Sequence, residues 1–177
     1  CPDVYVLSDY YFIDTDNLGL LKEILDYVKN NDIMLCIPKT WIPLYVEAYG
    51  ADENKLIGFS EDRIELSFPT KEQLSVYSKA HNVITRYGIP IASALCDEIY
   101  IAGCDGTKIS KEEKLEWKHS QKDQKEEEEN ITVAKQEILN HYAFMEELLT
   151  YGESKGKKYF SFVESYIPAL SSRRCRE

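Results

Sequence analysis

Short apolar runs alternate with helix-length segments along this chain, and this alternation limits the folds that it can adopt. Residues 32–38 (DIMLCIP) form a continuous apolar run that stops at Pro38, which is typical of a strand buried on both faces in a parallel sheet. The preceding segment 15–31 repeats leucine, isoleucine and valine with helical spacing, so it predicts a helix with one apolar face. Strands and helices in alternation predict an α/β fold with a mostly parallel sheet.

The rest of the chain continues this pattern. We also expect strands within 3–12, 55–59, 63–68, 98–102 and 158–163, and helices at 40–50, 70–87, 89–96 and 132–156. The apolar stripe of the last helix comprises Ile138, Tyr142, Met145, Leu148 and Leu149. Gly156 is a typical residue to end that helix.

Chain length and local charge indicate the domain organisation. The chain has 177 residues, of which 44% are hydrophobic, enough for the core of a single domain over residues 1–177. Its first residues already follow a strand pattern, so we expect further chain upstream of Cys1. Residues 110–130 are dominated by charge, which favours a solvated, mobile segment over the alternative of a lid above a site.

Net charge and cysteine spacing exclude several classes of protein. The formal net charge is −10, whereas a nucleic-acid-binding protein needs a basic surface. No apolar run reaches the roughly 18–20 residues of a transmembrane helix. The five cysteines are scattered and contain no Cys-x-x-Cys pair, which indicates reduced thiols of a cytosolic protein rather than a disulfide framework or a metal site.

Asp105 is the leading candidate for chemistry, because it stands in the glycine-rich loop Gly103–Gly106 directly after the strand 98–102. Glycines allow a sharp turn and the close approach of a ligand. The carboxylate could serve as a nucleophile, a base or an acceptor for a sugar hydroxyl, whereas the plainer alternative is a turn-forming aspartate. Ligands of parallel sheets bind beyond the carboxyl ends of the strands, so we expect this loop, Ser8-Asp9 and residues 164–166 at one edge.

Three histidines offer an imidazole for general acid or base catalysis. His81 falls in the predicted helix 70–87, where we expect it either at the surface or in helix packing. His119 falls in the charged segment, where we expect it to be exposed to solvent. His141 lies next to Tyr142 in the predicted helix 132–156. It is the catalytic candidate, with a purely structural helical histidine as the alternative.

A phosphate-binding turn is a further candidate at Thr85-Arg86-Tyr87-Gly88. It precedes the predicted helix 89–96, and helix N-termini favour anions while arginine pairs with phosphate through two hydrogen bonds. The alternative is an ordinary helix break with an exposed arginine. The sequence contains neither a G-x-G-x-x-G motif nor a Walker loop, so a standard dinucleotide or P-loop site is not supported.

Three stretches together resemble a known family. The stretches are residues 82–106 (NVITRYGIPIASALCDEIYIAGCDG), 140–170 and 2–12 (PDVYVLSDYYF). They are similar to segments of bacterial CMP-sialic acid-dependent sialyltransferases and of the related MptE-like 6-hydroxymethylpterin pyrophosphokinases. The chain also resembles the retaining Kdo transferases, which likewise use a CMP-sugar. The resemblance implies a Rossmann-like open, mostly parallel sheet with helices on both faces. The opening GxGPS unit of the family is missing here, so we expect a first βα unit upstream.

The resemblance also implies roles for individual residues. His141 would be the general base, Asp105 the carboxylate after the strand, and Ser165 part of the loop on the donor side. The nucleotide site that we predict comprises Thr85, Arg86, Gly88, Gly103, Ser165 and Tyr166. The donor is a substrate, so we expect neither a separate cofactor nor a metal.

The function implied is transfer of a sialic acid or Kdo-type sugar from a CMP-activated donor to a cell-surface glycan, as in lipopolysaccharide or capsule biosynthesis. Such an enzyme would act in the cytoplasm at the inner face of the membrane, with peripheral membrane contact and without nucleic acid. An inverting mechanism with His141 and a retaining one with Asp105 both stay open. The alternatives are an ATP-dependent pyrophosphokinase and a non-catalytic nucleotide-binding or interaction domain.

Overall fold

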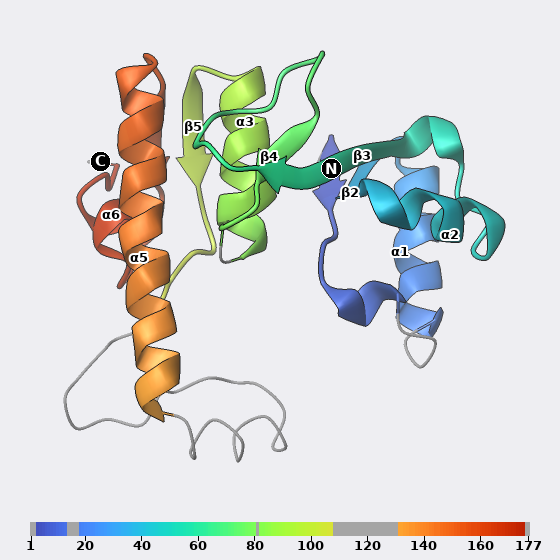
Figure 1. Ribbon diagram of the computed structural model, residues 1–177, viewed down its shortest axis with the longest axis horizontal. Helices are drawn as coiled ribbons and strands as arrows, with labels where there is room; N and C mark the ends of the chain where they lie inside the picture. Colours follow the sequence, from blue (N-terminus) through green and yellow to red (C-terminus); the bar gives the residue numbers. More distant parts are fainter. Residues whose placement is uncertain (1–2, 14–17, 81, 108–130, 176–177) are drawn as a thin grey trace. The chain divides into compact units, whose positions relative to one another are not determined.

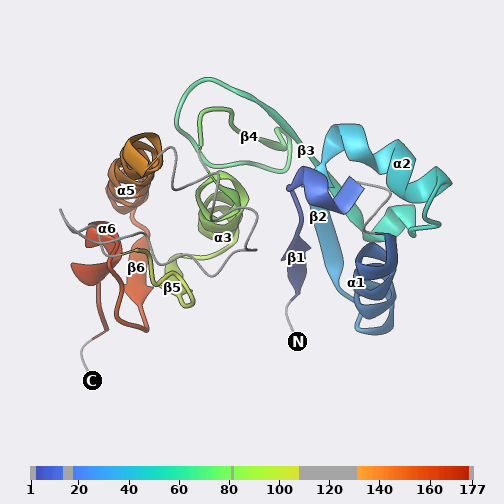
Figure 2. The same ribbon diagram turned by 90° about the horizontal axis from the view of Figure 1, so that it is seen from below.

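The computed structural model describes residues 3–13, 18–80, 82–107 and 131–175. The chain forms two compact units, which comprise Cys1–Ala94 and Leu95–Glu177. Figure 1 labels most of the helices and strands of both units, and Figure 2 adds the labels of β1 and β6. The predicted charged segment 110–130, His81 and His119 lie outside the described residues. The prediction of a single domain stays a prediction.

The first unit contains a four-stranded, all-parallel sheet with the strands in sequential order. Its strands are β1 (Val4–Val6), β2 (Met34–Pro38), β3 (Leu56–Arg63) and β4 (Ser75–Tyr77). Leu35 of β2 pairs with Leu56 of β3, and the register between β3 and β4 shifts between Ser60 and Arg63. Short 3₁₀ helices lie at Tyr10–Ile13, Lys39–Trp41 and Glu53–Lys55.

Helices cover both faces of this sheet. On one face, α1 (Leu18–Asn30) and α2 (Ile42–Glu47) pack against Leu35 and Ile37 of β2, and Figure 2 shows both helices on the same side of that strand. On the other face, Cys36 packs against Tyr87 from a π-helical turn (Ile84–Gly88), which leads into α3 (Ile89–Leu95). The structure therefore confirms an α/β fold with an open parallel sheet and helices on both faces.

The central strand β2 has almost no contact with solvent. Leu35, Cys36 and Ile37 are fully buried, as the continuous apolar run predicts. Burial disfavours the charged thiolate and raises the pKa of Cys36 to about 12. Cys36 is therefore a neutral, apolar component of the core.

The second unit is built around a parallel pair of strands. β5 (Glu98–Ile101) and β6 (Lys158–Ser161) are connected by the long helix α5 (Ile131–Ser154), and α6 (Pro168–Ser171) follows β6. α5 packs against both β6 and α6. All members of the predicted apolar stripe of α5 are buried. Gly156 has a positive φ of 83° just beyond the helix end, as expected for a helix-terminating glycine.

Close packing between α5 and β6 depends on Gly152. A Cβ atom at this position would lie 1.9 Å from the hydroxyl oxygen of Tyr159 and 2.6 Å from its Cζ atom. Only the absence of a side chain lets the Tyr159 ring lie against the helix. Arg173 also connects the C-terminal segment to α5 through Glu146 (2.9 Å) and Glu153 (2.6 Å).

Three predicted elements differ from the structure. The helix predicted at 70–87 is wrong, because this segment contains β4 and the π-helical turn. Pairing with β3 buries Ser75 and Val76, and this burial outweighs the helical propensity of the surrounding residues. The strand predicted at 63–68 is also wrong, since β3 ends at Arg63, and β1 occupies only Val4–Val6 of the stretch 3–12.

Within the described ranges, no helix combines the length and the apolar character that spanning a membrane requires.

Candidate functional site

The loops that follow β5 and β6 are hydrogen-bonded to each other. The Ser165 hydroxyl donates to the carbonyl oxygen of Cys104 at 2.6 Å and lies 3.2 Å from that of Asp105. The Tyr166 N–H donates to the Asp105 carbonyl at 2.6 Å. Because β5 and β6 are parallel, both loops lie at the carboxyl edge of the pair. The structure thus brings together Gly103, Asp105, Ser165 and Tyr166.

Two glycines shape the loop around Asp105. Gly103 and Gly106 have positive φ values of 73° and 70°, a conformation that other residues adopt only with strain. At Gly106 the neighbours are also close, since a Cβ would lie 2.7 Å from Cγ1 of Ile167 and 2.8 Å from the Tyr142 hydroxyl. A glycine here allows the Asp105 loop to pack against both α5 and the loop after β6.

The Asp105 backbone is held by these contacts while its side chain stays exposed. Among the described residues, no hydrogen bond or ion pair reaches its carboxylate. The neighbouring Cys104 is partly buried, and burial together with the Asp105 charge raises the pKa of the Cys104 thiol. A negatively charged oxygen pair is therefore presented to solvent from a fixed loop.

Helix α5 reaches the same loop through Tyr142. The buried Tyr142 hydroxyl accepts a hydrogen bond from the Thr107 N–H at 2.6 Å and donates to the Thr107 carbonyl at 3.0 Å. His141 is partly exposed, and its ring centroid lies 6.0 Å from that of Tyr142. The structure therefore joins the helix of His141 to the Asp105 loop. A common cavity for Asp105 and His141 stays a prediction.

Tyr142 was not assigned to the site from the sequence, where it counts as part of an apolar stripe. A signal is nevertheless present, because a buried tyrosine hydroxyl usually needs a hydrogen-bond partner. Tyr166, by contrast, exposes 59% of its surface. Its ring is available to stack on a planar or ring-shaped ligand.

The other predicted nucleotide contacts belong to the first unit. Thr85 is fully buried, and its hydroxyl lies 3.2 Å from Oδ1 of Asn82. The Arg86 guanidinium donates to Glu61 at 3.2 Å and to the Ala80 carbonyl at 2.7 Å. These side chains hold the turn itself together, and their role in nucleotide binding stays a prediction, as does that of Gly88.

Glu61 was not identified from the sequence, although it organises this turn. Its Oε1 atom accepts from the Tyr87 hydroxyl at 2.6 Å as well as from Arg86. Burial, and then the hydrogen bond to Glu61, raise the pKa of Tyr87. The Nε atom of Arg86 is buried without a hydrogen-bond partner among the described residues. Within the same ranges, no three histidine, cysteine or acidic side chains gather as metal ligands would.

Comparison with known proteins gives no match to this chain. No family model, curated protein or solved structure matches it. The function is therefore argued from the residues and their geometry.

Proposed function

We propose that this chain transfers a sialic acid or Kdo-type sugar from a CMP-activated donor to the hydroxyl of a glycan acceptor. The observation that carries the proposal is the hydrogen-bonded junction between the loops after β5 and β6. The Ser165 hydroxyl and the Tyr166 N–H hold the backbone at positions 104 and 105, while the Asp105 carboxylate stays exposed. Ligands of parallel sheets bind at this edge.

In this proposal Asp105 and His141 act on the two sides of the transfer. In a retaining reaction, Asp105 attacks the anomeric carbon, the bond to the CMP phosphate breaks, and the acceptor hydroxyl then displaces Asp105. In an inverting reaction, the acceptor oxygen attacks the anomeric carbon directly. In either case His141 takes the proton from the acceptor hydroxyl, and CMP leaves as a phosphate monoester that needs little protonation.

The same loops supply contacts for the donor. The absence of a side chain at Gly103 and the exposed ring of Tyr166 suit a nucleotide that lies across the carboxyl edge of β5 and β6.

The test is the release of CMP from CMP-sialic acid and from CMP-Kdo, followed by chromatography, with Asp105→Asn as the decisive variant. In a retaining reaction, where Asp105 is the nucleophile, we expect Asp105→Asn to lower turnover by at least roughly 10²–10⁴-fold. An inverting reaction through His141 does not use this carboxylate as a nucleophile. Asp97→Asn is the matched control. Asp97 directly precedes β5, at the opposite end of the same strand, and pairs with Lys157 at 2.9 Å, an interaction that an asparagine can retain in part.

Undiminished turnover in Asp105→Asn would remove this residue from the mechanism. Thermal-shift measurements with CMP, CTP, ATP and GTP side by side distinguish the donor class. Stabilisation by CMP and CTP supports the proposal, whereas stabilisation by ATP alone would contradict it and favour a pyrophosphokinase. No stabilisation by any nucleotide would favour an interaction domain.

A further inference from the structure

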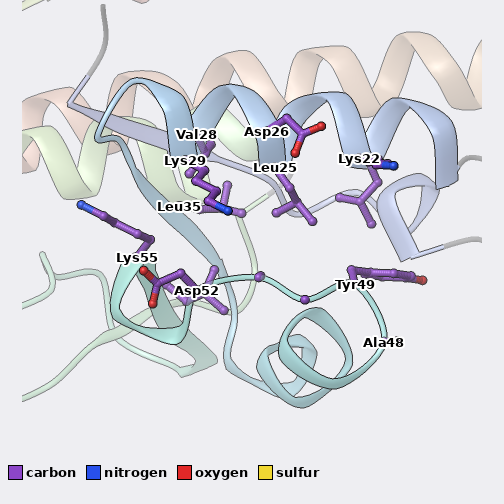
Figure 3. A pocket seen from close by; sticks show the side chains of 14 residues that line it. Lys22, Leu25, Asp26, Val28, Lys29, Leu35, Ala48, Tyr49, Asp52 and Lys55 are labelled. Carbon is purple, nitrogen blue, oxygen red and sulfur yellow. The ribbon is translucent and has the colours of Figure 1, made fainter.

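A pocket of about 300 Å³ lies in the first unit between α1 and the loop that follows α2 (Figure 3). It lies near the amino ends of β2 and β3, because Leu35 and Leu56, near the start of those strands, line it. This is the opposite sheet edge to the one where ligands of parallel sheets usually bind. The sequence motifs do not point to this place.

The floor of the pocket is apolar and belongs to the core of the unit. Leu21, Val28 and Leu35 are buried there, and Leu25 and Leu56 are partly exposed. Figure 3 shows Leu25 pointing into the space between α1 and the loop, with the Tyr49 ring at one end. An apolar, partly aromatic lining of this kind favours a ring rather than a strongly hydrated ligand.

The opposite wall is kept open by small residues. Gly50 has a positive φ of 67°, and a Cβ atom there would meet no other atom within 4 Å. Ala48 and Ala51 also line this wall, and the Ala51 N–H donates to the Tyr45 carbonyl at 3.0 Å. This hydrogen bond holds the loop in place, so the space is present before any ligand arrives.

Lysines give the rim of the pocket its chemical character. Lys22 and Lys29 of α1 both line it, and they lie seven residues apart, about two helical turns, on one side of the helix. Figure 3 shows Lys29 extending from α1 toward the loop. Neither forms an ion pair with another described residue. Lys55, the third lysine of the lining, is already paired with Asp32.

Two carboxylates, Asp52 and Asp26, also line the pocket, and they differ in whether they are free to interact with the lysines or with a ligand. Asp52 is engaged in its own loop, where its side chain accepts from the Asn54 N–H at 3.0 Å. Asp26 lies on α1 between the two lysines without an ion pair to a described residue. The rim thus combines two available ammonium groups with one available carboxylate.

We infer that this pocket binds a small aromatic carboxylate, with its ring against Leu25 and Tyr49 and its anionic group at Lys29. A cavity of about 150 Å³ holds a single benzene ring, so the space suits a bicyclic acid. The inference is independent of the proposed sugar transfer, since it uses none of the same residues.

The experiment measures the binding of 2-naphthoate by its fluorescence, with naphthalene-2-carboxamide as a neutral ligand of the same shape. We expect saturable binding of the acid and at least fivefold weaker binding of the amide. Lys29→Gln should lower the affinity for 2-naphthoate roughly tenfold, as expected for the loss of one hydrogen bond to a charged group. Asp26→Asn should raise this affinity. Lys79 is an exposed lysine outside the pocket, so Lys79→Gln should leave the affinity unchanged.

Other outcomes overturn the inference. Equal affinities for the acid and the amide would exclude recognition of the charge. If Lys79→Gln lowers the affinity for the acid as much as Lys29→Gln does, the lysines attract anions only in a general way. Ala48→Leu, which adds a side chain to the open wall, should abolish binding of both ligands. If the circular dichroism spectrum and melting temperature of Ala48→Leu are unchanged and binding persists, the ligand lies elsewhere and the inference fails.

Discussion

The two parallel sheets of this protein bury their strands in different ways. In the first unit, the three central residues of β2 are fully buried, because helices cover both faces. In the second unit, exposed and buried residues alternate along β5 and β6. Ile99 and Tyr159 are buried, whereas Tyr100 exposes 52% of its surface. Parallel sheets are usually covered on both faces, so the open face of β5 and β6 is the less usual arrangement.

The difference shows that two sheets of the same strand polarity are stabilised by different contacts. On the open face, the Tyr100 ring stacks with both Phe160 and Phe162, with ring centroids 4.9 and 5.1 Å away. These rings reduce the area in contact with water without a covering helix. The stability of the second unit must therefore depend mainly on the buried face and its packing against α5.

The largest effect is expected in the first unit. Leu35→Ala removes a fully buried side chain from β2 and should lower the free energy of unfolding by about 2–5 kcal/mol. Native-state hydrogen exchange is the suitable measurement, because it reports on each unit separately. Amides of β1–β3 should lose protection while those of β5 and β6 keep theirs. Equal losses in both sheets would show that the units unfold together.

The second unit should be most sensitive at Gly152. Gly152→Ala forces a methyl group against the Tyr159 ring, and we expect a destabilisation of about 1–3 kcal/mol from overpacking. Chemical denaturation measures it. The double variant Gly152→Ala, Tyr159→Leu should be less destabilised than the sum of the single variants, because the two positions are in contact. Strict additivity would contradict the close approach of α5 and β6.

Tyr100→Ala provides the direct counterpart to Leu35→Ala. It removes a ring from the open face, where the loss is limited to stacking and partial burial, and we expect a cost of about 1 kcal/mol. The same denaturation experiment applies. A cost as large as that of Leu35→Ala would mean that this face is covered in solution and would remove the contrast between the two sheets.

The smallest effect is a dependence on pH confined to the second unit. The hydrogen bond from Arg173 holds the pKa of Glu146 below its ordinary value of 4.5. A lowered pKa in the folded state stabilises the protein above pH 4.5, and this contribution is lost as the pH falls through the folded value. Solvent screening limits it to less than about 1 kcal/mol.

Glu146→Gln tests this linkage between pH and stability. The stability of Glu146→Gln should fall less than that of the wild type between pH 5 and pH 3. Thermal unfolding across this range measures the difference. Identical pH profiles for the two proteins would show that the ion pair with Arg173 does not contribute to folding.

The contrast between the sheets was predictable in part. The uninterrupted run 32–38 indicates burial on both faces, and the spacing of apolar residues in 132–156 predicts the buried stripe of α5 correctly. β4 was missed because its three residues are too few for a periodic signal, and pairing with β3 rather than local propensity determines their structure.

The sequence predicted the candidate site only for residues whose place in the fold follows from their position at the end of a strand. Asp105 and Ser165 follow parallel neighbouring strands, so the sequence order itself brings their loops to one edge. The roles of Tyr142 and Glu61 depend on side-chain contacts with Thr107 and Arg86. Such contacts between distant positions leave no periodic pattern in a single sequence.

The buried thiol of Cys36 also provides an intrinsic probe of the opening of the first sheet. A buried, neutral thiol with a pKa of about 12 in the middle of β2 is protected from alkylation, because the thiolate is the form that attacks an alkylating reagent. Cys96 is exposed and should react at once. The rate of alkylation at Cys36 therefore measures how often the strands separate, and no label has to be introduced into the protein first.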